Sequence, residues 1–454
     1  MSDLIERRPL HVICFHLLIC QTMNNNKITL NRRLSLSLIT FYGLGNILGA
    51  GIYVLVGKVA GEAGYFAPLS FFIASIIAAI SAFTYAELSA RYPVSAGEAV
   101  YLYEGFGLQK LSLVVGLMIA FAGIVSSATI AHGFAGYLRV FVDLPQWSLI
   151  TMLLLVLGLL AAWGIGQSVR VAALLTLVEI AGLLIIIFVG ADDLPRLWQV
   201  YQHGPQPDLQ LIMQPGMQAV AQPVMQTGQQ SIFHGFSLLG VTAGAFLAFY
   251  AYIGFEDMVN VAEEVKDPQR TMPRAILLSV VISMLLYSIV ALVSISVLTP
   301  AELALSEAPL AAVYVKATGQ APVIISIIGA FAVINGALIQ IIMTSRMFYG
   351  LADRGWLPGF LQTIYPLTRT PLNSTLLTVS LMILFALALP MVTLAEMTSY
   401  LILLVFVLVN LALIKIKRRI PRPEGVRVYS PWLPIAGFVT ALTFLLIELL
   451  SHLF

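Results

Sequence analysis

Long apolar segments recur along most of this chain, and they constrain its fold more than any other feature. A helix that crosses a bilayer needs about 20 consecutive, mostly apolar residues. Such segments occur near residues 38 to 57, 66 to 90, 111 to 134, 146 to 165, 168 to 190, 237 to 262, 274 to 298, 322 to 345, 372 to 392, 395 to 414 and 431 to 451. Because 59% of the residues are hydrophobic and only 10% are charged, the chain is predicted to be an all-α integral membrane protein with about eleven transmembrane helices.

The same composition argues against several other functions. The net charge of +2 is too small for a nucleic-acid-binding surface. Cys14 and Cys20 have neither the number nor the spacing of a disulfide framework or a zinc site. The sequence also lacks a nucleophile with its base, a phosphate-binding loop and a metal-ligand cluster. We therefore expect no enzyme activity, no cofactor and no metal, whereas the sequence leaves the oligomeric state open.

The distribution of basic residues predicts how the chain is oriented in the cell membrane. With a cytoplasmic N-terminus, about 20 of the 24 lysines and arginines lie on the cytoplasmic side, as the positive-inside rule prefers. The exceptions are Lys58, Arg139, Arg196 and Lys316. The basic stretch 415–427 then lies in a cytoplasmic loop, where it could contact anionic lipid, although a topology signal is the favoured explanation.

The segments and loops divide the chain into five parts. Residues 192–236 form one long extracellular loop, rich in glutamine and interrupted by prolines, between two groups of five spans. Met23 is a plausible alternative start of the natural chain. The predicted parts are a cytoplasmic tail (1–33), a first five-helix repeat (34–191), the glutamine-rich loop (192–236), a second five-helix repeat (237–416), and a basic loop with the eleventh helix (417–454).

The first helix of each repeat contains residues that disfavour a continuous helix. Four glycines lie within the nine residues 43–51, and each costs close to 1 kcal/mol relative to alanine inside a helix. Close helix packing could explain them. The sixth segment, however, carries Gly254, Glu256 and Asp257 within an apolar stretch at the matching position. Paired interruptions predict inverted repeats with broken helices 1 and 6 and a binding site near the membrane midplane.

Broken helices expose backbone groups that suit a zwitterion. Unwinding at residues 49–51 would free N–H groups at the positive end of a half-helix, which favours a carboxylate. Unwinding at residues 250–254 would free carbonyl groups, which favour an ammonium group. The pattern therefore predicts an amino acid as the substrate, with side-chain selectivity supplied by aromatic residues such as Phe249 and Tyr252.

Several motifs in the same order resemble the amino acid, polyamine and organocation (APC) superfamily of amino acid permeases, in particular its cationic amino acid transporter-like branch. They are Gly49-Ala50-Gly51-Ile52, Tyr85 to Pro93, Gly254-Phe255-Glu256, Glu263 to Pro268, and Ser345 to Pro358. The resemblance implies a LeuT-type bundle of two five-helix inverted repeats. It also implies alternating access, and secondary transport coupled to protons or to exchange.

The resemblance also implies site residues. Gly49, Ala50 and Gly51 would bind the substrate carboxylate, and Glu256 matches the carboxylate that follows the broken segment of helix 6 in the family. Of the two adjacent acids, Glu256 is therefore the one expected to face the pathway, and it is a candidate for coupling. The expected substrate-binding residues are Ile47, Gly49, Ala50, Gly51, Phe249, Ala251, Tyr252 and Ile253.

Glu179 is the strongest candidate for coupling, because it lies in the middle of the fifth span. The membrane interior penalises a charged carboxylate, so this residue could carry a proton. The alternative is a protonated structural residue that is hydrogen-bonded to a neighbouring helix. Several proton-coupled transporters that the chain resembles look to have a lysine at this position, so an acidic residue here departs from the family pattern. Sodium is the less favoured coupling ion, with Thr344 and Ser345 as its candidate ligands.

The remaining polar residues of the spans have simpler interpretations. We expect Asp257 to pair near the cytoplasmic end, Glu87 to pair with Arg91, and His132 to pack through a hydrogen bond. Asn335 and Gln340 are expected to make polar contacts within the bundle. Alternatives to an amino acid transporter are a carrier of polyamines or other amines, an amino acid sensor, and a subunit that requires a partner. A channel is disfavoured because no polar filter is evident.

Overall fold

The computed structural model describes residues 30, 32–139, 144–203, 237–306, 308–389 and 391–451. Within these ranges the regular secondary structure is helical, apart from two isolated β-bridges. The predicted tail falls outside the described residues except at its end, and so does the loop over 204–236.

Each predicted span corresponds to a helix or to a broken pair of helices. Eight stretches have the length and hydropathy of membrane spans; the first, Leu36–Arg91, holds two of the predicted spans, and two shorter apolar helices follow at Leu372–Ala388 and Trp432–Ile447. The helices are α2 (Leu36–Leu48) with α3 (Ala50–Ala63), α4 (Ala67–Arg91), α6 (Gln109–Arg139), α7 (Gln146–Trp163), α8 (Ile165–Gly190), α12 (Leu238–Tyr252) with the 3-10 helix η4 (Glu256–Glu264), α13 (Pro268–Val297), α16 (Val323–Asp353), α17 (Leu372–Ala388), α18 (Met391–Arg419) and α19 (Trp432–Ser451).

Short helices that the apolar pattern did not predict connect the spans. They lie outside the long apolar segments, which is why hydropathy alone misses them. They are η1 (Gly64–Phe66), α5 (Gly97–Phe106), η2 (Ala191–Asp193), α9 (Leu194–His203), α14 (Pro300–Leu305), α15 (Pro309–Thr318) and η5 (Gly359–Gln362).

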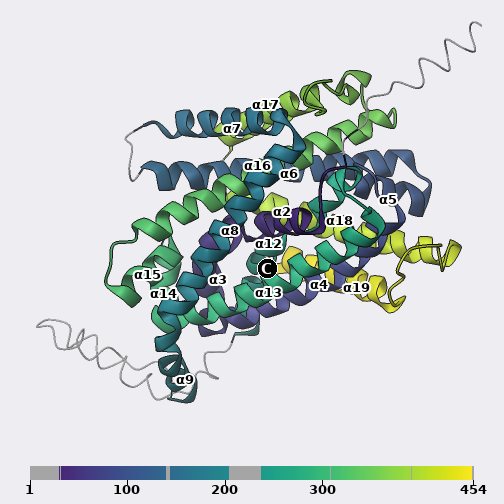
Figure 1. Cartoon of the computed structure of the whole chain (residues 1–454). Helices are drawn as coiled ribbons and strands as arrows, with labels where there is room; N and C mark the ends of the chain where they lie inside the picture. Colours follow the sequence, from purple (N-terminus) through teal and green to yellow (C-terminus); the bar gives the residue numbers. More distant parts are fainter. Residues whose placement is uncertain are drawn as a thin grey trace, which may run out of the picture.

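The broken helices lie at the centre of the bundle (Figure 1). Helix α2 packs against α8, α13 and α16, and α3 packs against α12. Around them, α6 packs against α16 and α7 against α17. Gly51 permits the contact between α3 and α12, because a Cβ atom on it would lie 2.7 Å from the Ala251 Cα atom. The glycines of the first span thus serve both the break and close packing.

The structure confirms both predicted breaks, but each break covers fewer residues than predicted. Gly49 alone separates α2 from α3, and its backbone leaves the helical region (φ −34°, ψ −123°). Helix α12 continues through Tyr252, two residues past residue 250, where unwinding was expected to begin. The second break therefore covers residues 253–255. The chain then continues as the 3-10 helix η4.

The end of η4 joins the segment before α2. The Arg33 and Leu34 N–H groups both donate to the Glu264 carbonyl, at 2.9 and 3.0 Å, and the Lys266 N–H donates to the Leu34 carbonyl at 2.9 Å. The Glu264 side chain forms a fully buried ion pair with Arg346 of α16, at 3.1 Å. These contacts tie both broken helices to α16 at one end of the bundle.

A second buried ion pair connects α4 to α18. Arg91 lies 2.7 Å from the carboxylate of Glu87, as the sequence predicted, and Lys417 of α18 binds the other oxygen at 2.9 Å. The Tyr429 N–H also donates to Glu87, at 2.9 Å. The pair is therefore a structural link between three segments of the chain.

Candidate functional site

A small cavity lies beside the break between α12 and η4. It has a volume of about 10 Å³, which is room for about one water molecule. Both Glu256 and Asp257 line it, although we expected only one of these acids to face the pathway. The other lining residues come from α6, α16, α18 and the break itself; they are Ile119, Ala122, Gly123, Ser126, Ile253, Gln340, Met343 and Ile402.

Asp257 is the centre of a buried polar network that joins α2, η4 and α16. Its Oδ2 atom accepts hydrogen bonds from Asn46 Nδ2 at 2.6 Å and from Gln340 Nε2 at 2.7 Å. Gln340 also donates to Asn46 Oδ1 at 3.2 Å. The expectation that Asp257 pairs near the cytoplasmic end is therefore wrong, because two amides from the centre of the bundle bind it instead.

Gly254 allows the chain to turn at this point. Its φ of +134° disfavours any residue with a side chain, and an added Cβ atom would lie 2.7 Å from Asn46 Nδ2. The Gly254 carbonyl accepts a hydrogen bond from Asn46 at 3.0 Å, and its N–H donates to Glu256 Oε2 at 2.9 Å. Glu256 Oε1 has no hydrogen-bond partner among the described residues. One oxygen of this buried carboxyl group thus remains available to a substrate or a proton.

Tyr287 of α13 binds a carbonyl group at each broken helix. Its hydroxyl lies within hydrogen-bond distance of the Ile47 carbonyl and 3.2 Å from the Ala251 carbonyl. Both carbonyls lose their usual helical N–H partner because their helix ends there. The two carbonyl groups share the single hydroxyl hydrogen of Tyr287, which thereby couples α2 to α12 at the breaks.

We predict that Tyr287→Phe destabilises the folded protein by about 1–3 kcal/mol, since a carbonyl group left unsatisfied in an apolar interior costs this much. The ring contacts with Tyr252 and Phe71 should survive, because phenylalanine keeps the ring. The measurement is the apparent melting temperature of the detergent-purified protein, with substrate uptake assayed in parallel.

Tyr85→Phe is the matched control. Tyr85 is equally buried and contacts Phe255 and Phe406 through its ring, but its hydroxyl has no hydrogen-bond partner among the described residues. Its loss should leave stability unchanged or slightly increased. Equal destabilisation by both variants would show that the hydroxyl of Tyr287 has no special role.

The structure places the predicted substrate residues in different surroundings. Ile253 lines the cavity together with Glu256. Ile47 and Ala251 lie at the two breaks, with their carbonyl groups on Tyr287. Gly49, Ala50 and Gly51 form the start of α3, which has no side-chain cap, so its first N–H groups lack a partner from the cap.

Two predicted aromatic residues do not line this cavity. Phe249 packs in an aromatic cluster with Phe406 of α18 and Phe444 of α19, at ring-centroid distances of 5.8 and 6.1 Å. Tyr252 packs against Tyr287 at 5.0 Å. Both rings are buried between helices. In this conformation they therefore pack on the broken segment instead of lining the cavity.

Glu179 lies in a separate polar cluster between α8 and α16. Its Oε1 atom accepts a hydrogen bond from Asn335 Nδ2 at 2.8 Å, and Asn335 also donates to the Thr176 hydroxyl at 3.0 Å. A Cβ atom on Gly45 of α2 would lie 2.3 Å from Asn335 Nδ2. Glu179 Oε2 has no partner among the described residues. The carboxyl group is thus fully buried and connected to the first broken helix through Asn335.

One of the two hydroxyl groups considered as sodium ligands, that of Ser345, lies close to a positive charge. Arg346 Nη1 donates a hydrogen bond to the Ser345 hydroxyl at 3.0 Å. A bound cation at that point would be repelled by the guanidinium group. His132, by contrast, behaves as predicted, since its ring contacts the Ala386 carbonyl at 2.7 Å and Gln146 at 3.1 Å.

Glu98 is a buried acid that no sequence motif indicated. It lies in the first turn of α5, where the helix dipole favours negative charge, and the neighbouring Gly97 N–H donates to Asn260 of η4 at 3.1 Å. Burial, aided by the charge of Asp257, raises the pKa of Glu98 to about 8. Glu98 is therefore protonated near neutral pH.

The chain is similar in sequence to known transporters. The chain is 29% identical to cationic amino acid transporter 4 of Arabidopsis thaliana, over 95% of this chain and 69% of the relative. It is 25% identical to two proteins of Bacillus subtilis. One is a methylthioribose transporter, aligned over 97% of this chain and 91% of the relative, and the other is the branched-chain amino acid permease BcaP, aligned over 90% and 85%.

The fold is that of a solved transporter. A Na⁺-coupled sialic acid symporter in a substrate-bound outward-open state matches with a TM-score of 0.59 over 97% of this chain and 95% of the other, at 13% identity. This likeness confirms the LeuT-type arrangement with its two broken helices. The family model of the amino acid permeases matches residues 34–451. The chain is thus a multi-pass membrane protein that belongs to the amino acid permease family.

Proposed function

We propose that this protein is a proton-coupled secondary transporter, not an enzyme, that carries an amino acid across the cell membrane by alternating access, with its N-terminus in the cytoplasm. One observation carries the proposal: two broken helices meet at the centre of the bundle, and two buried carboxyl groups line a cavity at the second break. Broken helices of this kind bind small charged substrates at the membrane midplane.

The cavity favours an ammonium group. Glu256 and Asp257 contribute two carboxyl groups, and none of the described residues that line the cavity is basic. A positively charged amine would compensate this buried acidity, because charge-assisted hydrogen bonds are strong in a site that excludes water. The free Oε1 atom of Glu256 is the acceptor that we assign to the substrate amine.

The start of α3 suits the other end of an amino acid. Gly49 provides no side-chain cap, and the following 14-residue helix directs its first N–H groups toward the break. A carboxylate there would accept hydrogen bonds from these groups and interact favourably with the helix dipole. A substrate with a carboxylate and an ammonium group matches both ends of the site, so we favour an amino acid over a polyamine.

The small cavity volume supports a mechanism that requires movement. About 10 Å³ holds one water molecule but no amino acid. The site must therefore expand before substrate binds. We assign this expansion to displacement of the broken segments relative to α6 and α16, which form the facing wall. Such rocking around a central site is the general mechanism of inverted-repeat transporters.

The test is uptake of a mixture of radiolabelled amino acids into proteoliposomes, with and without an inward proton gradient. We expect accumulation that depends on the gradient and is competed by the unlabelled substrate. If one proton accompanies each amino acid, a gradient of one pH unit sustains roughly tenfold accumulation. No uptake of any amino acid by correctly folded protein would contradict the proposal, and would favour a sensor, a carrier of other amines or a partner-dependent subunit.

A further inference from the structure

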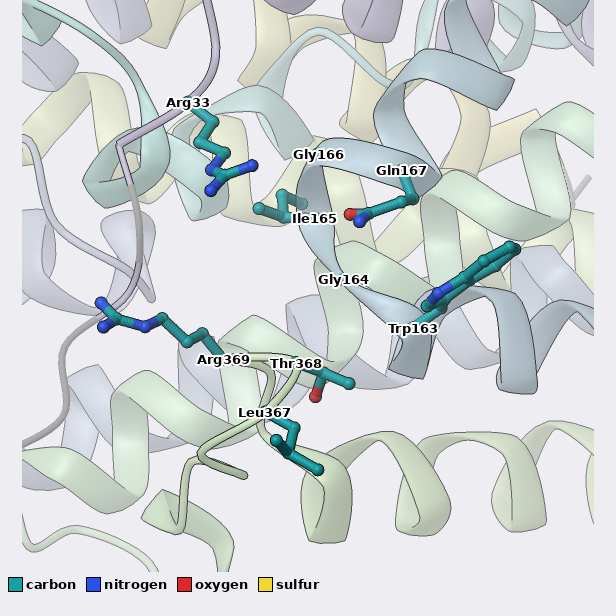
Figure 2. A pocket seen from close by; sticks show the side chains of 9 residues that line it. All are labelled: Arg33, Trp163, Gly164, Ile165, Gly166, Gln167, Leu367, Thr368 and Arg369. Atoms are coloured by element: carbon teal, nitrogen blue, oxygen red, sulfur yellow. The ribbon is translucent and has the colours of Figure 1, made fainter.

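A larger cavity lies away from the broken helices, where α7 ends and α8 begins. Its volume is about 150 Å³. The loop that precedes α17 and the segment that precedes α2 complete its wall (Figure 2). The positive-inside rule predicts that this surface faces the cytoplasm. Figure 2 shows the side chain of Arg33 reaching toward Ile165 and Gly166.

The charged side chains that line the cavity are basic. Arg33 and Arg369 line it. Arg170 lies at its edge, because its Nε atom donates to the Gly166 carbonyl at 2.7 Å, and its Nη2 atom would lie 3.7 Å from a Cβ atom on Gly166. No acidic residue is among the described lining residues, and none of the three arginines forms an ion pair within the described part of the chain. The cavity therefore concentrates positive charge that lacks a counter-ion among the residues that the structure describes.

The backbone of α8 adds donors to this positive charge. The N-cap residue of this 26-residue helix is Gly164, which offers no side-chain cap, and the Ser168 N–H is already bound to the Gly164 carbonyl at 3.0 Å. The preceding N–H groups of the first turn have no helical partner. Gly166 keeps the surface open between Arg33 and Arg170. Arginines around an uncapped helix start provide the chemistry that binds a phosphate group.

Apolar side chains beside the arginines indicate which kind of molecule carries the phosphate group. Trp163 is 64% exposed and Leu367 is 84% exposed, and both line the cavity. Tryptophan is enriched at the level of the lipid headgroups, where its ring contacts the acyl chains and its N–H faces water. A soluble anion would gain nothing from these two residues, whereas a phospholipid would contact them with its glycerol and acyl groups.

We propose that this cavity binds the phosphate of an anionic phospholipid from the adjacent leaflet. Arg33 and Arg369 contact the phosphate, Arg170 and the first N–H groups of α8 complete the site, and Trp163 with Leu367 packs against the chains. Because Arg33 directly precedes Leu34, whose backbone is bound to Glu264 and Lys266, the lipid also holds the segment that leads into the first broken helix.

The test is native mass spectrometry of the full-length protein titrated with phosphatidylglycerol or phosphatidylcholine. Removal of one arginine near an anionic headgroup should weaken binding roughly fivefold, so Arg33→Gln/Arg369→Gln should weaken phosphatidylglycerol binding by about 25-fold. Lys110→Gln is the control, because Lys110 is exposed at the start of α6, outside both this cavity and the basic stretch 415–427. It should bind as the wild type does.

A second variant keeps every charge. Gly166→Leu should fill the cavity and reduce phosphatidylglycerol binding, and its first added carbon would lie at an ordinary 3.5 Å from Arg33 Cδ. The proposal is overturned if the double variant binds normally, or if Lys110→Gln loses as much affinity. Competition by inorganic phosphate at the same concentration as the lipid would assign the cavity to a free anion and refute the lipid assignment.

Discussion

Arg346→Met is expected to destabilise this protein by about 3–5 kcal/mol, because it leaves the buried carboxylate of Glu264 without its counter-charge. Both side chains of this ion pair are fully buried, and Arg346 Nε lies 3.1 Å from Glu264 Oε1. The variant must therefore protonate Glu264 or admit water beside α16. The measurement is the apparent melting temperature of the purified protein and its yield in detergent.

The double variant Glu264→Gln/Arg346→Met separates charge from packing. Replacing both members of a buried pair is often close to neutral, so the double variant should recover most of the lost stability. Lys417→Met is a matched control at the other ion pair, because Glu87 keeps Arg91 when the lysine is removed. Lys417→Met should destabilise the protein less than Arg346→Met does. A double variant as unstable as the single one would show that packing, not charge, holds this end of the bundle.

At the broken helices, the sequence predicted the breaks but not the local backbone geometry. Glycines 43, 45, 49 and 51 predicted a break in the first span, since their cost in a helix requires compensation, and Gly49 is where α2 ends. The paired interruption at Gly254 was found in the same way. The 3-10 geometry of η4 could not be predicted, because it depends on how Glu264 and Val265 pair with the segment before α2.

The sequence predicted less of the polar network at the centre of the bundle than of the helix breaks. Gln340 was expected to make polar contacts, but its partners Asn46 and Asp257 are distant in sequence and meet only in the folded bundle. Tyr287 resembles any aromatic residue of an apolar helix, so nothing in the sequence indicated that it binds carbonyl groups of two other helices. A signal did exist for Asn46, since an amide within a glycine-rich membrane segment requires a buried partner.

Glu179→Gln is expected to abolish proton-driven accumulation while leaving exchange of labelled for unlabelled substrate intact. Glutamine keeps the size of the side chain and a hydrogen bond to Asn335, but it cannot bind or release a proton. The accumulation ratio under a gradient of one pH unit should fall from roughly tenfold to equal concentrations. Uptake and counterflow in proteoliposomes measure the two activities separately, so a variant that merely misfolds would lose both.

Glu98→Gln is the matched comparison, because Glu98 is also a fully buried acid but lies in α5, outside the membrane spans. Its pKa of about 8 keeps it protonated at pH 7, and it ionises as the pH rises through that value. Glutamine mimics the protonated form, so this variant should accumulate substrate normally at pH 7 and should lose any decline in uptake between pH 7 and 9. If Glu98→Gln uncouples transport and Glu179→Gln does not, the coupling proton resides at the start of α5. If both variants remain coupled, the proton must bind at the broken helix itself, where the free oxygen of Glu256 is the remaining candidate.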